Sequence, residues 1–112
     1  MLTPGDVVEL DLGIPTSSEA GMLRPAIVLT AAQVLRGSPN VIQVVPLTTT
    51  LRDSRAEIRV EPDALNGLNH VSAAQCQHIR SVATTRVSNL LGNVGPVILK
   101  QLRNTVALLI DA

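Results

Sequence analysis

Short apolar segments separated by turn residues are the feature of this sequence that most restricts its fold. "GDVVELDL" alternates apolar and polar residues, with Val8, Leu10 and Leu12 on one face, as a half-buried strand does. "AEIRVEP" alternates in the same way, with Glu57 and Arg59 expected to face solvent. Glycine, proline, asparagine and serine lie between the segments. The expected strands, five or six in number, lie within residues 5–12, 24–30, 41–49, 56–62, 70–82 and 89–94.

The C-terminal segment has helical spacing instead. Gly95–Pro96 opens it, and proline is tolerated in the first turn of a helix. The expected apolar stripe consists of Ile98, Leu102, Val106, Leu109 and Ile110. We expect this helix to pack across the sheet. Strands followed by one helix predict a mainly β fold with helices, built as a small curled antiparallel sheet or partial barrel in one domain.

Composition limits the kinds of binding site that the chain offers. The sequence contains no Phe, Tyr or Trp, so it lacks the aromatic platforms on which many proteins stack nucleic-acid bases. Its formal net charge is zero, so an anion site must be local. Every basic residue except Lys100 is arginine, which suits bidentate phosphate contacts, although codon usage in a GC-rich genome gives the same bias. Cys76 lies in an apolar run and is interpreted as a small core residue.

The N-terminal segment "MLTPGDVVELDL" carries charges where a secretion signal has its apolar region. No apolar run is long enough to span a bilayer. We therefore expect a cytoplasmic protein that does not associate with membranes. His70, His78 and Cys76 do not have the spacing of a zinc site, and we expect neither a metal nor another cofactor.

Arg24 is the first candidate functional residue. It precedes Pro25 at the start of an apolar strand, beside a loop of about ten residues, and proline restricts the backbone of the residue before it. A guanidinium stays protonated, so it binds a phosphate and neutralises charge rather than acting as a base. The alternative is a strand-edge arginine paired with Glu19 or Asp11. Residue type alone leaves both interpretations open.

The second candidate is the run of threonines after the most apolar strand. Pro46 predicts a bulge or a strand end just before them. Thr48 and Thr50 share a face if the chain is extended, and hydroxyl groups at a strand end are well placed to hold phosphate oxygens. The alternative is that these β-branched residues only complete the strand.

The third candidate is "QHIRS", residues 77–81. If residues 70–82 form one strand, Cys76, His78 and Arg80 share a face. Arg80 is then a candidate second phosphate-binding cation, and Gln77 or His78 is a candidate reader of a base. The alternative is a solvent-exposed strand face.

Taken in this order, the segments resemble the MazF/PemK family of bacterial toxin endoribonucleases. The similar segments are "GDVVELDLG", "SEAGMLRPAIVLT", "VIQVVPLTT", "QHIRS" and "LLGNV", and they extend from Gly5 to about Leu109. The combination of "RPA" with "PLTT" at this distance is the most specific part. The resemblance implies a single domain over residues 1–112, with an SH3-like, CcdB-MazF-like small antiparallel β-barrel and a C-terminal helix. It also implies a homodimer.

The resemblance implies the toxin of a type II toxin–antitoxin system. Such a toxin is a metal-independent, sequence-specific endoribonuclease that cleaves single-stranded RNA to 2′,3′-cyclic phosphate and 5′-hydroxyl ends, and its partners are RNA and a cognate antitoxin protein. By family role, Arg24 stabilises the developing phosphorane, Thr48 holds a phosphate oxygen, and Glu19 activates or orients the 2′-hydroxyl. The expected RNA-binding residues are Ser18, Thr49, Thr50, Gln77, His78 and Arg80.

Two other functions remain open on the sequence. The same barrel serves as a non-catalytic gyrase inhibitor that binds through its C-terminal helix, whereas this chain ends in the core-like "ALLIDA". The second alternative is an inactive protein that only binds RNA or an antitoxin. Relatives usually carry aromatic residues at Val8 and Leu10, and an acidic residue and a glutamine at Gln77 and His78, so we expect a distinct cleavage motif.

Overall fold

The computed structural model describes residues 1–11 and 23–111 of the chain. The strands are β1 (Asp6–Asp11), β2 (Leu23–Val28), β3 (Val41–Thr48), β4 (Glu57–Val60), β5 (Ser72–Gln75), β6 (Arg80–Ala83) and β7 (Val87–Asn93). The helices are α1 (Ala32–Leu35), the 3₁₀ turns η1 (Cys76–His78) and η2 (Thr84–Arg86), and α2 (Gly95–Leu109). The predicted order of strands followed by a closing helix is confirmed.

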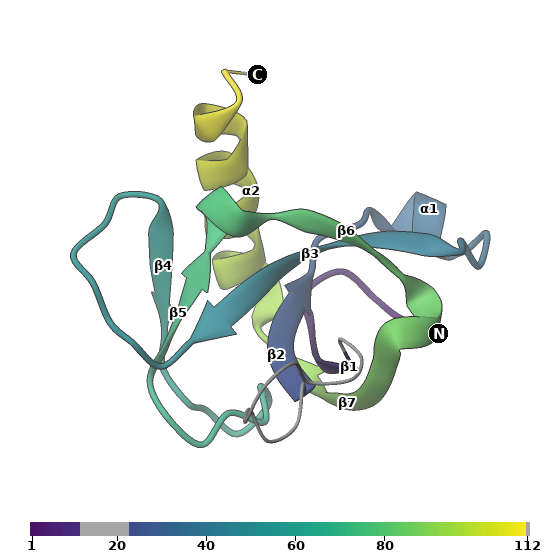
Figure 1. The fold of residues 1–112 in the computed structure, drawn as a ribbon, viewed down its shortest axis with the longest axis horizontal. Coiled ribbons are helices and arrows are strands. Elements are labelled where there is room, and N and C mark those ends of the chain that lie inside the picture. Colours follow the sequence, from purple (N-terminus) through teal and green to yellow (C-terminus); the bar gives the residue numbers. More distant parts are fainter. Residues whose placement is uncertain (12–22, 112) are drawn as a thin grey trace, which may run out of the picture.

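The seven strands form one antiparallel sheet with the order β4-β5-β3-β2-β1-β7, and β6 pairs with β3 beside this path. Figure 1 shows the segment from β6 to β7 wrapping around β1, β2 and β3, so that the sheet curls on itself. The prediction of a curled antiparallel sheet is therefore confirmed. The central position predicted for residues 41–49 is also confirmed, because β3 pairs with β2, β5 and β6.

Pro46 marks the point where β3 changes its partner. Residues Val41–Val44 pair with β6, and Leu47 and Thr48 pair with β5. Proline has no N–H to donate, so it disturbs least at a position between two pairings. The strand continues through Pro46 to Thr48 rather than ending before the threonines. This change of partner divides the sheet into a curled part and an extension formed by β5 and β4.

Alternate residues of the central strands enter two separate cores. Val7 and Ile27 contribute to the core that α2 covers, whereas Val8 and Ala26 contribute to the core inside the curled part of the sheet. The prediction that β1 is half-buried is therefore wrong at its start, where Val7 and Val8 are both fully buried. The core inside the curl reaches its end at Leu10, and this end forms the floor of the site described below.

The predicted apolar stripe of α2 holds over most of the helix. Leu102 is fully buried, and Ile98 and Val106 pack against the same core. At the C-terminal end the prediction is wrong, because Leu109 and Ile110 are exposed. Figure 1 shows this end of α2 extending beyond the described strands of the sheet. Residues 108–111 of the tail "ALLIDA" are therefore not core-like in the structure.

Residues 70–82 do not form the single strand that the sequence predicts. β5 ends at Gln75, η1 turns the chain through Cys76–His78, and β6 starts at Arg80. Cys76 points into the core, and its burial raises the pKa of the thiol to about 11. The predicted shared face is therefore wrong for Cys76, whereas His78 and Arg80 both line the pocket described below. The interpretation of Cys76 as a core residue is confirmed.

Gly92→Ala is expected to destabilise the fold. An added Cβ at Gly92 would overlap the carbonyl oxygen of Leu65, which is backbone and cannot turn away. Overpacking of this kind costs about 1–3 kcal/mol of unfolding free energy, which urea denaturation measures. Gly37→Ala is the matched control, because the nearest atom to its added Cβ, the Val34 oxygen, is 3.4 Å away. Equal midpoints for the two variants would contradict this packing.

Candidate active site

The strand register brings Arg24 and Thr48 to the same face of the sheet. Ala26 of β2 lies opposite Pro46 of β3, so the same register continued by two residues places Arg24 opposite Thr48. On the other side of β3, Thr48 lies opposite Ala73 of β5. Directly opposed residues of antiparallel strands project their side chains to the same face. Two residues that are 24 positions apart in sequence thus become neighbours at the end of the curled part.

A pocket of about 580 Å³ lies at this end of the sheet. Its apolar floor includes Leu10, Ala26 and Val44 from the core inside the curl. Its polar lining consists of Arg24, Thr48, Thr49, Thr50, Gln75, His78 and Arg80. Six of the nine residues predicted for the site line this pocket. No carboxylate is among the lining residues in the described part of the chain, so the pocket is locally positive in a chain with zero formal net charge.

The threonine run turns at the end of β3 rather than continuing as a strand. Thr48 is the last residue of β3, and its Oγ1 accepts a hydrogen bond from the backbone N–H of Thr50 at 3.1 Å. The shared extended face expected for Thr48 and Thr50 is therefore wrong, although both line the pocket. Because Oγ1 accepts the Thr50 N–H, the hydroxyl hydrogen of Thr48 remains available to a phosphate oxygen.

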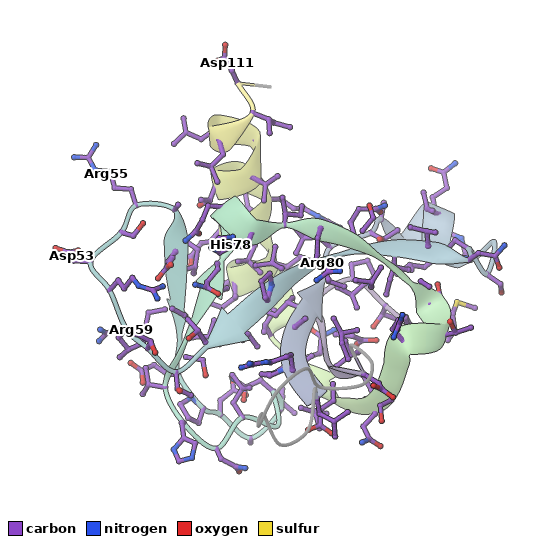
Figure 2. All side chains as sticks on the ribbon, in the orientation of Figure 1. Asp53, Arg55, Arg59, His78, Arg80 and Asp111 are labelled. Carbon is purple, nitrogen blue, oxygen red and sulfur yellow. The ribbon has the colours of Figure 1, made fainter. Side chains whose placement is uncertain are left out.

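The side chains of the two pocket arginines make no polar contact with the described residues. Within residues 1–11 and 23–111, the side chains of Arg24 and Arg80 make no hydrogen bond and no ion pair, and the ion pair in this part joins Arg52 and Glu57. Figure 2 shows His78 and Arg80 on the segment that leads from η1 into β6, beside β3. Two guanidinium groups in one pocket suit a phosphate of a nucleic-acid backbone.

Gln77 does not reach the pocket. Its Nε2 donates a hydrogen bond of 2.6 Å to Glu57 Oε2 on the neighbouring strand β4. Gln75, which the sequence analysis did not single out, lines the pocket instead. Strand alternation from Ala73, which opposes Thr48, would have identified Gln75, provided that the end of β5 was known.

Glu57 is buried beneath polar side chains, although the sequence predicts that it faces solvent. Its side chain is 2% exposed and accepts from Arg52, Gln75 and Gln77. The hydrogen bond from Gln77 contributes most to lowering the pKa of Glu57, while desolvation acts in the opposite direction. The amide of Gln75 and the charge of Arg52 lower it further. The carboxyl group therefore remains ionised at neutral pH.

Two predicted site residues, Ser18 and Glu19, lie outside the described residues. In the described ranges, no group of three or more His, Cys, Asp or Glu side chains is arranged to hold a metal ion. None of the helices in these ranges has the length and apolar character needed to cross a membrane.

A family profile described as "PemK-like, MazF-like toxin of type II toxin-antitoxin system" matches residues 3–110. The chain belongs to this family. The PemK/MazF resemblance predicted from "RPA" and "PLTT" is thus confirmed. Among curated relatives, the chain is 32% identical to endoribonuclease MazF9 of Mycobacterium tuberculosis over 118 aligned positions, covering 99% of this chain and 98% of that protein. It is 33% identical to endoribonuclease MazF3 of the same species over 69 positions, 62% of this chain and 64% of that protein.

Solved structures show the same PemK/MazF fold. An endoribonuclease in complex with its cognate antitoxin, from a mycobacterial species, superposes with a TM-score of 0.80 at 19% identity, covering 99% of this chain and 96% of that one. A MazE–MazF complex from Deinococcus radiodurans superposes with a TM-score of 0.78 at 23% identity, covering 98% and 96%. The predicted small barrel-like sheet with a C-terminal helix is therefore confirmed, with an open rather than closed sheet.

Proposed function

We propose that this PemK/MazF toxin is a metal-independent, sequence-specific endoribonuclease that cleaves single-stranded RNA. The observation that carries the proposal is the placement of Arg24 and Thr48 on one face of a locally positive pocket. The relatives named endoribonuclease MazF9 and MazF3 support the same activity. The pocket combines a fixed cation, a hydroxyl donor and an apolar floor, which suits a phosphate with an adjacent base.

The proposed reaction is an internal transesterification. The ribose 2′-oxygen attacks the adjacent phosphorus, the bond from phosphorus to the 5′-oxygen breaks, and a 2′,3′-cyclic phosphate and a 5′-hydroxyl result. Arg24 neutralises the charge that develops on the phosphoryl oxygens, and Thr48 donates its hydroxyl hydrogen to one of them. Glu19 takes or orients the proton of the 2′-hydroxyl, and the 5′-oxygen takes a proton from water as it leaves.

The neighbouring phosphates and bases are proposed to contact the rest of the pocket. Arg80 is the second phosphate-binding cation, and Thr49 and Thr50, which line the same pocket, are further RNA contacts. His78 lines the same wall and offers ring nitrogens to a base edge. Ser18 is proposed to add an RNA contact from the preceding loop. Gln77 stays a proposed RNA contact of lower rank, because it is not among the residues that line the pocket.

We propose that the chain acts in the cytoplasm as a single domain and a homodimer, and that a cognate antitoxin protein neutralises it. The family description and the antitoxin-bound structure of the mycobacterial endoribonuclease support the antitoxin. The exposed Leu108, Leu109 and Ile110 at the end of α2 give the monomer an uncovered apolar surface, which supports association with a protein partner.

The test is incubation of the purified chain with several single-stranded RNAs, with a gyrase supercoiling assay run in parallel. We expect cleavage at a recurrent short motif and unchanged supercoiling. Intact RNAs with inhibited supercoiling would overturn the proposal in favour of the gyrase inhibitor. Intact RNAs with unchanged supercoiling would favour a protein that only binds RNA or its antitoxin.

A further inference from the structure

The wall of the pocket on the β5 side contains a glutamine whose amide is held in one orientation. Glu57 and Gln75 are directly opposed on β4 and β5, and Gln75 Nε2 lies 3.3 Å from Glu57 Oε2. An ionised carboxylate only accepts hydrogen bonds, so the NH₂ group of Gln75 must face Glu57. The carbonyl oxygen of the amide therefore faces away from β4.

The other side of Gln75 is the pocket itself. Leu47 opposes Ala74, so the same register places Pro46 opposite Gln75. Pro46 and Gln75 both line the pocket, next to Thr48. In the described part of the chain, Gln75 Oε1 accepts no hydrogen bond. Gln75 thus presents an unoccupied acceptor, and the second hydrogen of its NH₂ group, beside the proposed phosphate site.

The surroundings of Glu57 hold this orientation. Three side chains donate to its Oε2, with distances of 3.2 Å from Arg52, 3.3 Å from Gln75 and 2.6 Å from Gln77. Its Oε1 is buried and has no hydrogen-bond partner in the described residues. A carboxylate that is buried and bonded from several sides has little freedom to turn. Reversing the Gln75 amide would place its carbonyl oxygen against this negative charge, which is unfavourable.

We propose that Gln75 reads an adenine next to the scissile phosphate, with its Oε1 accepting from adenine N6 and its Nε2 donating to adenine N7. This inference rests on the proposed ribonuclease function and deepens it. Glutamine matches adenine through this pair of contacts. Guanine is rejected because its O6 is an acceptor and would face the Gln75 acceptor. Glu57 is the positioning residue, since it touches the amide and not the RNA.

The proline ring beside Gln75 completes the base site. The chain has no aromatic residue on which a base could stack, so its apolar contacts must come from aliphatic surface. Pro25 and Pro46 supply rigid rings within the pocket lining. A base that packs on Pro46 has its polar edge next to Gln75, which lies opposite on the neighbouring strand.

The experiment maps cleavage sites of the full chain on a single-stranded RNA pool of randomised sequence. For the wild type we expect a motif with adenine at one position. For Gln75→Leu we expect the preference for adenine at that position to fall by roughly tenfold to a hundredfold, with the other positions unchanged. Glu57→Gln is expected to lower the adenine preference at that position by a smaller factor, because an amide at residue 57 tolerates both orientations of the Gln75 amide. Gln101→Leu, on an exposed position of α2, is the matched control with the wild-type motif.

Several results would overturn the inference. One is a wild-type motif without adenine, and another is a Gln75→Leu variant with the wild-type adenine preference. Loss of the preference in Gln77→Leu, but not in Gln75→Leu, would assign the reading to the other glutamine on Glu57. Thermal unfolding of each variant separates misfolding from altered reading. A wild-type protein that cleaves no RNA overturns the proposed function together with this inference. If the wild-type protein cleaves RNA and Gln75→Leu leaves the cleavage motif unchanged, the inference alone is overturned.

Discussion

Arg24→Ala is expected to lower the rate of RNA cleavage by about a hundredfold or more. The guanidinium lies on the same face as Thr48 and has no hydrogen-bond or ion-pair partner within residues 1–11 and 23–111. Its charge is therefore available when negative charge grows on the phosphoryl oxygens. Single-turnover cleavage of one RNA oligonucleotide measures the loss directly, because it isolates the chemical step from product release.

Arg103→Ala is the control for this variant. Arg103 is exposed on α2 and is not among the residues that line the pocket. We expect the Arg103→Ala variant to cleave RNA at the wild-type rate. We expect the Arg24→Ala variant to keep the wild-type midpoint of thermal unfolding, because Arg24 is exposed and is not part of the core. Equal losses of activity in both variants would mean that Arg24 acts through general charge and not in the chemical step.

Leu102→Ala is expected to destabilise the protein by about 2–5 kcal/mol. Leu102 is fully buried where α2 covers the sheet, in the same core as Ile27, Val45 and Leu47. No aromatic side chain is present to fill the cavity that the substitution leaves. Denaturation in urea measures the change in unfolding free energy.

Leu108→Ala is the matched control on the same helix. Leu108 is 78% exposed, so its truncation removes little buried surface, and surface substitutions usually stay within about 0.5 kcal/mol. The comparison uses the same residue type and the same helix, so helix propensity changes equally. If Leu102→Ala unfolded at the denaturant midpoint of Leu108→Ala, α2 would not be docked on the sheet as described.

The strand pattern was predictable because it depends on local alternation and turn residues. The segments with "RPA" and "VIQVVPLTT" became β2 and β3 with bounds close to those expected. The change of partner at Pro46 was not predictable, because it depends on where β5 and β6 pair along β3. The same non-local pairing explains why residues 70–82 divide into two strands.

The site was predictable where it depends on residue order and not where it depends on a turn. Arg24 directly precedes Pro25 near the start of β2, Thr48 is the last residue of β3, and the structure brings them together in the pocket. In contrast, Gln75 lines the pocket because β5 ends there, while η1 shifts the phase of the residues that follow and leaves Gln77 bonded to Glu57. The burial of Glu57 was hidden in the sequence, because its cover consists of polar side chains that pattern analysis assigns to the surface.

The most direct test of the account is an analysis of the RNA ends produced by the wild-type protein in excess EDTA. Mass spectrometry of the fragments of a cleaved oligonucleotide identifies the chemical groups at the two new ends, which differ between the possible cleavage reactions. We expect a 2′,3′-cyclic phosphate on one fragment and a 5′-hydroxyl on the other, with cleavage undiminished by EDTA. A 5′-phosphate with a free 3′-hydroxyl, or cleavage that disappears in EDTA and returns with a divalent metal, would contradict this expectation.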